Sequence, residues 1–180
     1  CLMEDNQKQI YIVLSQTGTI LSRILHLVTK KEYNHSSISM NRELTRMYSF
    51  GRRNPYNPIS AGFVRESPHF GTFKRFPETK IAVLSLTVSE ETYNEIGRLL
   101  EEMIGCSKHF HYDLLGLCAA AFRVNFRRRN HFYCSAFVKD VLEKYDVEGV
   151  EELAPITHPV DFMTLPGADL VYRGKMRDLA

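Results

Sequence analysis

Residues 81–88 (IAVLSLTV) form an apolar, partly β-branched run that passes directly into the start of a helix. Such a run is typical of a buried strand. Ser89-Glu90-Glu91-Thr92 follows, with a serine that can cap a helix N-terminus and two acids that favour the positive end of a helix dipole. The pattern predicts a helix that continues to residue 104. The chain therefore needs a fold in which a buried strand and an amphipathic helix share one core.

The rest of the chain alternates similar strand and helix signals. Alternating or β-branched apolar residues predict strands at residues 9–14, 63–64 and 169–173, and a hairpin with arms at 35–41 and 44–50. Apolar positions three to four residues apart predict further helices that start at residue 19 and cover 114–122 and 134–145. Strands interrupted by helices, with hairpin-like neighbours, indicate an α+β domain whose sheet is mainly antiparallel.

Length and composition fit one folded domain. The 180 residues suffice for one core and are too few for two substantial domains, so we interpret residues 1–180 as a single domain. A hydrophobic share of 44% and a charged share of 24% argue against disorder, collagen and coiled coil. With 23 Lys+Arg against 21 Asp+Glu, the formal net charge of +2 gives no overall reason to expect a nucleic-acid partner.

The chain shows neither a membrane or export signal nor a paired cysteine motif. No apolar stretch approaches the roughly 18 residues that span a bilayer, and the N-terminus lacks a secretory signal. The four cysteines, Cys1, Cys106, Cys118 and Cys134, contain no CxxC pair, which disfavours a zinc knuckle and a dithiol redox site. We expect free thiols and a cytoplasmic location, with Cys106 and Cys118 as inert core residues.

The segment Phe132-Tyr133-Cys134-Ser135-Ala136-Phe137-Val138 places a cysteine at the first turn of a predicted amphipathic helix. Unpaired N–H groups and the positive end of the helix dipole lower the pKa of a thiol there, and the same N–H groups can hold a developing oxyanion. Cys134 is therefore a candidate nucleophile. The alternative is that it is a small buried core residue.

A nucleophilic cysteine needs a base, and His35 is the best candidate. It opens a predicted strand whose next residues, Ser36 and Ser37, are small and polar, so its ring can face a groove. The alternative is a structural or solvated histidine, since the chain has seven. His131, three residues before Cys134, could contact the substrate, but the alternative is that His109, His111 and His131 are loop residues. These histidines lack companion cysteines or acids at metal-ligand spacing, so neither a metal nor another cofactor is expected.

Three segments carry a family resemblance: Asn34-His35-Ser36-Ser37-Ile38-Ser39, Tyr48-Ser49-Phe50-Gly51-Arg52 and the cysteine segment from Phe132 to Val138. Together they resemble circularly permuted papain-like proteins of the NlpC type. Unpermuted relatives place the cysteine helix before the histidine sheet, whereas here His35 precedes Cys134. This order is similar to the permuted clade that also contains lecithin retinol acyltransferase-like enzymes. Over residues 9–172, the resemblance implies a permuted papain-like fold in which the nucleophile helix packs against a mainly antiparallel sheet.

The resemblance also implies a cysteine hydrolase or acyl-transfer enzyme. In this interpretation Cys134 attacks a carbonyl, His35 accepts and returns the proton, and the intermediate is an acyl-enzyme thioester. Family members usually carry a third, ring-orienting group on the strand after the histidine strand. Ser49 fits that place best, and Glu43 near the turn is the second choice.

Further residues are candidates for contacting the substrate. Tyr112 and Tyr133 could line the groove or donate to an oxyanion, with simple packing as the alternative. Arg128 belongs to a basic loop, residues 123–130, that immediately precedes the nucleophile helix and could steer an anionic substrate toward Cys134, with Arg52 and Arg53 on the same face. The alternative is that this loop is merely solvated.

Three functions follow as hypotheses. The first is a peptidase or amidase that hydrolyses an amide bond in a peptide-like or small acyl substrate. The second is a lipid-directed acyltransferase or thioesterase, which would need an apolar acyl channel lined by residues such as Phe63, Phe70, Phe73 and Phe76. The third is a catalytically silent binding module that uses the basic loop for a phosphate-bearing partner. The natural substrate and the oligomeric state stay open.

Overall fold

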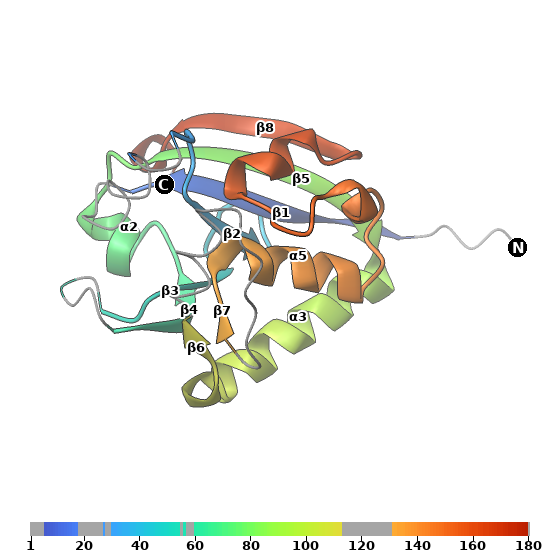
Figure 1. Ribbon diagram of the computed structural model, residues 1–180, viewed down its shortest axis with the longest axis horizontal. Helices are drawn as coiled ribbons and strands as arrows, with labels where there is room; N and C mark the ends of the chain where they lie inside the picture. Colours follow the sequence, from blue (N-terminus) through green and yellow to red (C-terminus); the bar gives the residue numbers. More distant parts are fainter. Residues whose placement is uncertain are drawn as a thin grey trace, which may run out of the picture.

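A computed structural model describes residues 6–17, 27, 30–54, 56, 60–112 and 131–179 (Figure 1). In this part of the chain an eight-stranded sheet has the order β7-β6-β4-β3-β2-β1-β5-β8. All neighbouring strands are antiparallel except β6 and β7, which are parallel. The strands are β1 Gln7–Gln16, β2 His35–Ser39, β3 Met47–Arg52, β4 Ala61–Glu66, β5 Lys80–Ser89, β6 His111–Tyr112, β7 His131–Phe132 and β8 Ala168–Lys175.

The helices that the structure describes pack against both faces of this sheet. They are α2 Gly71–Arg75, α3 Glu90–Gly105 and α5 Cys134–Lys144, with short 3-10 turns at η1 Ser107–His109, η2 Val150–Glu152, η3 Pro159–Thr164 and η4 Met176–Asp178. None of the helices in the described ranges combines the length and the apolar character needed to cross a bilayer.

Strand β1 shows why the sheet has two apolar faces. Side chains alternate between the two sides of a strand. Ile10, Ile12 and Leu14 accordingly belong to the larger core cluster, whereas Val13 lies between them in sequence and belongs to the smaller one. The larger cluster contains residues of α3 and α5, and Figure 1 shows these two helices beside each other. The smaller cluster includes Phe73 of α2.

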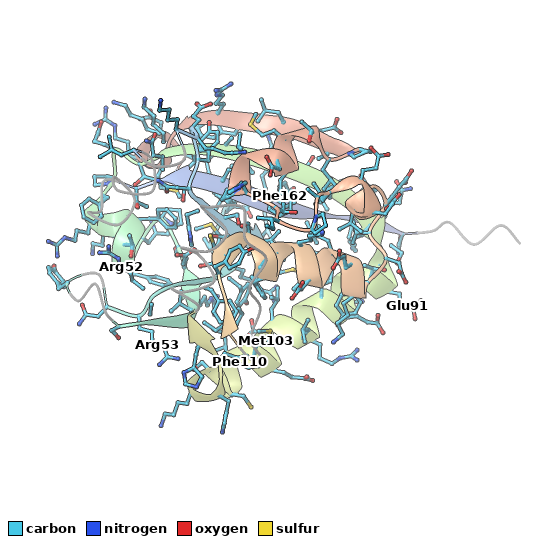
Figure 2. All side chains as sticks on the ribbon, in the orientation of Figure 1. Arg52, Arg53, Glu91, Met103, Phe110 and Phe162 are labelled. Carbon is cyan, nitrogen blue, oxygen red and sulfur yellow. The ribbon has the colours of Figure 1, made fainter. Side chains whose placement is uncertain are left out.

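Aromatic side chains anchor α5 on the sheet. The ring of Phe137 in α5 contacts Phe50 of β3 and Phe63 of β4, with ring centroids 5.4 and 5.2 Å apart and edge-to-face geometry. Phe110 joins this group from the end of η1 and contacts both Phe50 and Phe63. Arg53 holds this corner, because its guanidinium donates to the carbonyl oxygens of Ser107 and Phe110 (Figure 2). These contacts fix the position of α5 on the sheet, and with it the position of its N-terminus at Cys134.

The predicted α+β class with a mainly antiparallel sheet is confirmed. The predicted strands correspond to β1, β4, β5 and β8, the hairpin arms to β2 and β3, and the helices after Ser89 and from Cys134 to α3 and α5. The predicted helix over 114–122 and the basic loop 123–130 lie outside the described residues, as does the predicted helix from residue 19 apart from Leu27.

The structure confirms two predictions about the cysteines and contradicts one. Cys134 is a free, buried thiol, and Cys106 is free as expected. The expectation that Cys106 is a core residue is wrong, because it lies exposed where α3 ends. Cys1 and Cys118 lie outside the described residues.

Candidate active site

Cys134 is the first residue of α5, and its side chain is buried at 2% exposure. Tyr133 occupies the N-cap position but makes no side-chain capping bond, and the first turn of α5 contains no acidic residue. The first N–H groups of a helix have no partner within the helix and carry the positive end of its dipole. At the start of α5, neither a capping side chain nor an acidic residue compensates this positive charge. A sulfur anion at Cys134 is placed to do so.

The surroundings of the sulfur favour its ionised form. Burial acts to raise the pKa of Cys134, but the hydrogen bond and positive charge of His35, with backbone hydrogen bonds from Ser36 and Ser135, outweigh burial and hold this pKa below its ordinary value. When protonated, the thiol can donate to the carbonyl oxygen of Asn34, 3.8 Å away. The start of β2 therefore lies directly beside the start of α5.

His35 is the first residue of β2, and its ring interacts both with Cys134 and with a carboxylate from another strand. The ring nitrogen Nε2 is 3.2 Å and 3.3 Å from the two carboxylate oxygens of Glu66, the last residue of β4. Both side chains are largely shielded, with exposures of 17% for His35 and 11% for Glu66. A hydrogen bond between His35 and Cys134 also acts on the pKa of both groups, so the ring interacts with the sulfur as well as with the carboxylate.

Interactions among Cys134, His35 and Glu66 shift the pKa of each group toward its charged form. Burial acts to lower the pKa of His35, but the charge of Glu66 and hydrogen bonds with Cys134 and Glu66 raise it to about 10. Burial acts to raise the pKa of Glu66, but the charge and hydrogen bond of His35, together with Ser37 and Ser49, lower it overall. The three shifts act in one direction, because each stabilises the charged form: a thiolate at Cys134, an imidazolium at His35 and a carboxylate at Glu66.

Glu66 reaches His35 across the intervening strand β3. The ladders place β3 between β2 and β4, and Glu66 pairs with Met47. Because side chains alternate along a strand, Met47, Ser49 and Gly51 share one face. A Cβ atom on Gly51 would lie 3.1 Å from Glu66 Oε1 and 3.5 Å from His35 Cε1. The missing side chain at Gly51 therefore leaves the space in which the His35–Glu66 pair meets.

Ser37 holds the other side of the carboxylate. Its hydroxyl donates to Glu66 Oε2 at 2.6 Å and also lies 3.4 Å from His35 Nε2. Ser37 follows His35 by two residues in β2, so both side chains project from the same face. Within the described part of the chain, the assembled group is Cys134, His35, Glu66 and Ser37.

The predicted third residue does not make the predicted contact. Ser49 is fully buried beside Glu66, where it contributes to the lowered pKa of that carboxyl, but its hydroxyl makes no hydrogen bond of ordinary geometry. Glu66 makes the contact with the His35 ring instead. The second choice, Glu43, is exposed in the turn between β2 and β3 and accepts from the Asn41 side chain. A small-residue pattern, Ser49-x-Gly51, followed by a strand ending in an acid was the signal available for Glu66.

The remaining predicted residues are spread over several places. Tyr133 is buried and packs with Ala136 and Ile156. Tyr112 lies in β6, next to Phe132 of β7, but its side chain is outside what the structure describes, and so is the whole of Arg128. Arg53 is engaged by the Ser107 and Phe110 carbonyls.

The phenylalanines suggested for an acyl channel do not share one space. Phe63 belongs to the core beneath α5, and Phe73 belongs to the cluster on the opposite face of the sheet. Phe70 is exposed at 47%, and Phe76 lies against the guanidinium of Arg75. These four residues therefore do not form the channel that a lipid substrate would need.

The described residues contain no group of three or more His, Cys, Asp and Glu side chains arranged to hold a metal ion. No family model, curated protein or solved structure matches this chain.

Proposed function

We propose that this protein is a cysteine-nucleophile hydrolase, a peptidase or amidase, which cleaves an amide bond through an acyl-enzyme intermediate. One observation carries the proposal: a buried thiol, at a helix N-terminus without a side-chain cap, interacts with a histidine whose ring nitrogen also lies within hydrogen-bond distance of a carboxylate. A cysteine with a purely structural role does not require a histidine and a carboxylate beside it. Perturbed pKa values in a specific charge constellation are typical of functional sites.

In the acylation step, the Cys134 thiolate attacks the carbonyl carbon of the substrate, and a carbon–sulfur bond forms. The carbonyl oxygen becomes an oxyanion, for which the first-turn N–H groups of α5 are suitable donors. As the oxyanion collapses, the carbon–nitrogen bond breaks and the His35 imidazolium gives its proton to the departing amine. The product of this step is a thioester on Cys134 and a neutral imidazole on His35.

In the deacylation step, His35 accepts a proton from water while the water oxygen attacks the thioester carbonyl. The carbon–sulfur bond then breaks, the carboxylic acid leaves, and the thiolate–imidazolium pair is restored. Glu66 keeps its negative charge throughout, since its part is to hold the ring and stabilise the imidazolium. Each step uses only groups of this chain, substrate and water.

We further propose that the fold is the permuted papain-like fold of the NlpC type. The order of the chain supports this, because the strand with His35 comes first and the helix with Cys134 comes later. An antiparallel sheet packed against the nucleophile helix supports it as well. The placement of the phenylalanines favours amide hydrolysis over the lipid-directed alternative.

The first test measures the reactivity of the thiol without any assumption about the substrate. Iodoacetamide labelling of Cys134, followed by peptide mass spectrometry near pH 6.5, is expected to proceed faster than labelling of a model thiol. His35→Ala should reduce this rate roughly tenfold or more, because it removes the positive charge beside the sulfur. A wild-type rate no greater than that of the model thiol, unchanged in His35→Ala, would leave a silent binding module as the better interpretation.

The second test separates the two reaction classes. The protein is incubated with a mixture of activated peptide esters and long-chain acyl thioesters, quenched in acid, and weighed intact. A peptidyl adduct on Cys134 that is absent from Cys134→Ala supports the proposal. A long-chain acyl adduct in its place would overturn it in favour of the lipid-directed enzyme.

A further inference from the structure

We propose that Ser37 is a positioning residue of this site, which holds the Glu66 carboxylate in the orientation that serves His35. This inference rests on the proposed function, since it concerns the same thiol–imidazole pair. Ser37 does not touch the sulfur in any contact that the structure describes. It acts through Glu66, and through Glu66 on His35.

The geometry gives the hydroxyl a defined partner. Ser37 is fully buried, and its single hydroxyl proton has a carboxylate oxygen 2.6 Å away, a short distance typical of a charge-assisted bond. The oxygens Oε1 and Oε2 of Glu66 lie 3.2 and 3.3 Å from His35 Nε2. A hydroxyl on Oε2 therefore fixes the rotation of the carboxylate about its terminal bond, which is otherwise broad and soft.

Buried carboxylates need such support because a hydrogen bond to the charged form is what offsets loss of water. The neighbouring Ser49 hydroxyl is also buried near Glu66 but lacks ordinary hydrogen-bond geometry, and Gly51 offers no side chain. Among the described side chains around Glu66, Ser37 is thus the uncharged residue whose hydroxyl makes a short hydrogen bond to the carboxylate. Its loss should leave the charged form of Glu66 less stabilised and its carboxylate less firmly oriented toward His35, and so weaken the support for the His35 imidazolium.

The experiment compares Ser37→Ala with Ser39→Ala as a matched control. Ser39 is in the same strand, on the same face and equally buried, but its hydroxyl donates to the Asn41 carbonyl at 2.7 Å, away from Glu66. The readout is the rate of iodoacetamide labelling of Cys134 as a function of pH. Thermal unfolding of each variant reports whether the fold survives.

For Ser37→Ala, the pH window in which Cys134 is both ionised and paired with an imidazolium should narrow from both sides. The acid limb of the labelling profile should move to higher pH, and near pH 6 the rate should fall about three- to tenfold, the effect of one weakened hydrogen bond to a charged group. Ser39→Ala should keep the wild-type profile. A structural role alone would lower the stability of both variants and leave both profiles in place.

A second pair of variants isolates the hydroxyl from the shape of the side chain. Ser37→Thr and Ser37→Val add nearly the same volume, but only threonine keeps the hydroxyl. The threonine variant should retain most of the wild-type labelling rate, whereas the valine variant should behave like Ser37→Ala. If all substitutions at Ser37 prevent folding, NMR on the wild-type chain decides, because a hydroxyl proton bound to Glu66 should exchange slowly with solvent. A rapidly exchanging proton would overturn the proposal.

The two proposals fail in different ways. If His35→Ala leaves the Cys134 rate unchanged, the enzyme proposal fails, and the role of Ser37 falls with it. If the wild-type rate depends on His35 but Ser37→Ala and Ser37→Val both match the wild-type profile, the enzyme proposal stands and only the positioning role is wrong.

Discussion

The starts of α3 and α5 are two helix N-termini that the same chain treats in opposite ways. At α3, the Ser89 hydroxyl accepts the Thr92 N–H, and Glu90 and Glu91 place negative charge in the first turn. At α5, Tyr133 supplies no capping bond, the first turn holds no acid, and Cys134 comes first. The chain neutralises the positive end of α3 with its own residues, which stabilises the helix. The first turn of α5 carries no such acid, and under the proposed function we infer that an ionised Cys134 takes that place.

The largest expected difference is between the reactivities of two cysteines, one at the end of α3 and one at the start of α5. Cys106 is exposed at the C-terminal end of α3, whereas Cys134 is buried at the N-terminal start of α5. The carbonyl end of a helix offers an anion no stabilisation. Brief alkylation near pH 6, followed by peptide mapping, should therefore label Cys134 at least roughly tenfold faster than Cys106.

Exposure and electrostatics make opposite predictions here, which makes the measurement decisive. If access to solvent controlled labelling, Cys106 would react first. Unfolding the protein in denaturant supplies the control, because the two thiols should then react at similar rates. A preference for Cys106 in the folded protein would contradict the activated state of Cys134.

Glu66→Gln removes the negative charge that stabilises the His35 imidazolium near the N-terminus of α5. Glutamine keeps the shape of the side chain but removes the negative charge, so the His35 pKa should fall from its raised value of about 10. The labelling rate of Cys134 near pH 6.5 should drop about tenfold, since one unit of pKa corresponds to a factor of ten in ionisation. Glu43→Gln, an exposed acid in the turn between β2 and β3, is the control and should leave the rate unchanged.

Glu66→Gln should also change how the free energy of unfolding depends on pH. Because the His35 pKa is raised from 6.5 to about 10, its contribution to stability is complete below pH 6.5 and is lost as the pH rises toward 10. Because the Glu66 pKa is lowered from 4.5, its contribution is present above pH 4.5 and is lost as the pH falls. The difference in free energy of unfolding between wild type and Glu66→Gln, measured by urea titration, should therefore be largest between pH 4.5 and 6.5. A difference that grows toward pH 10 would contradict the pairing.

Glu66 also marks where prediction from the sequence ends. Ser89 and Thr92 are three residues apart, so the cap of α3 is a local signal, and the hairpin of β2 and β3 is set by neighbouring segments. The contact between Glu66 and His35 depends on the order of three strands and on which face each residue occupies. An argument from the hairpin alone extends only to the adjacent strand, and so it selected Ser49. The empty space at Gly51, which lets a side chain cross β3, becomes visible only once the register is known.

Gly51→Ala tests whether that empty space is needed. A Cβ atom there would come within 3.1 Å of Glu66 Oε1 and 3.3 Å of Ser49 Oγ, so the carboxylate must shift. We expect the Cys134 labelling rate near pH 6.5 to fall about threefold, with a loss of stability of about 1–3 kcal/mol from overpacking. Gly105→Ala at the end of α3 is the matched control, because a Cβ atom there meets nothing within 4 Å. A wild-type rate in Gly51→Ala would show that the pair tolerates a side chain at this crossing.

Ser89→Ala examines the other helix and should have the smallest effect on the site. Removing the hydroxyl that accepts the Thr92 N–H should lower the free energy of unfolding by about 1 kcal/mol, as loss of an N-cap does, and Ser89→Asp should restore most of it. Both changes are measured by denaturant titration. Labelling of Cys134 should keep its rate and its pH profile in both variants, because the cap of α3 serves only α3. If Ser89→Ala slowed the labelling as much as Glu66→Gln does, the loss of reactivity would follow general destabilisation, and the division of roles between the two helix ends would be wrong.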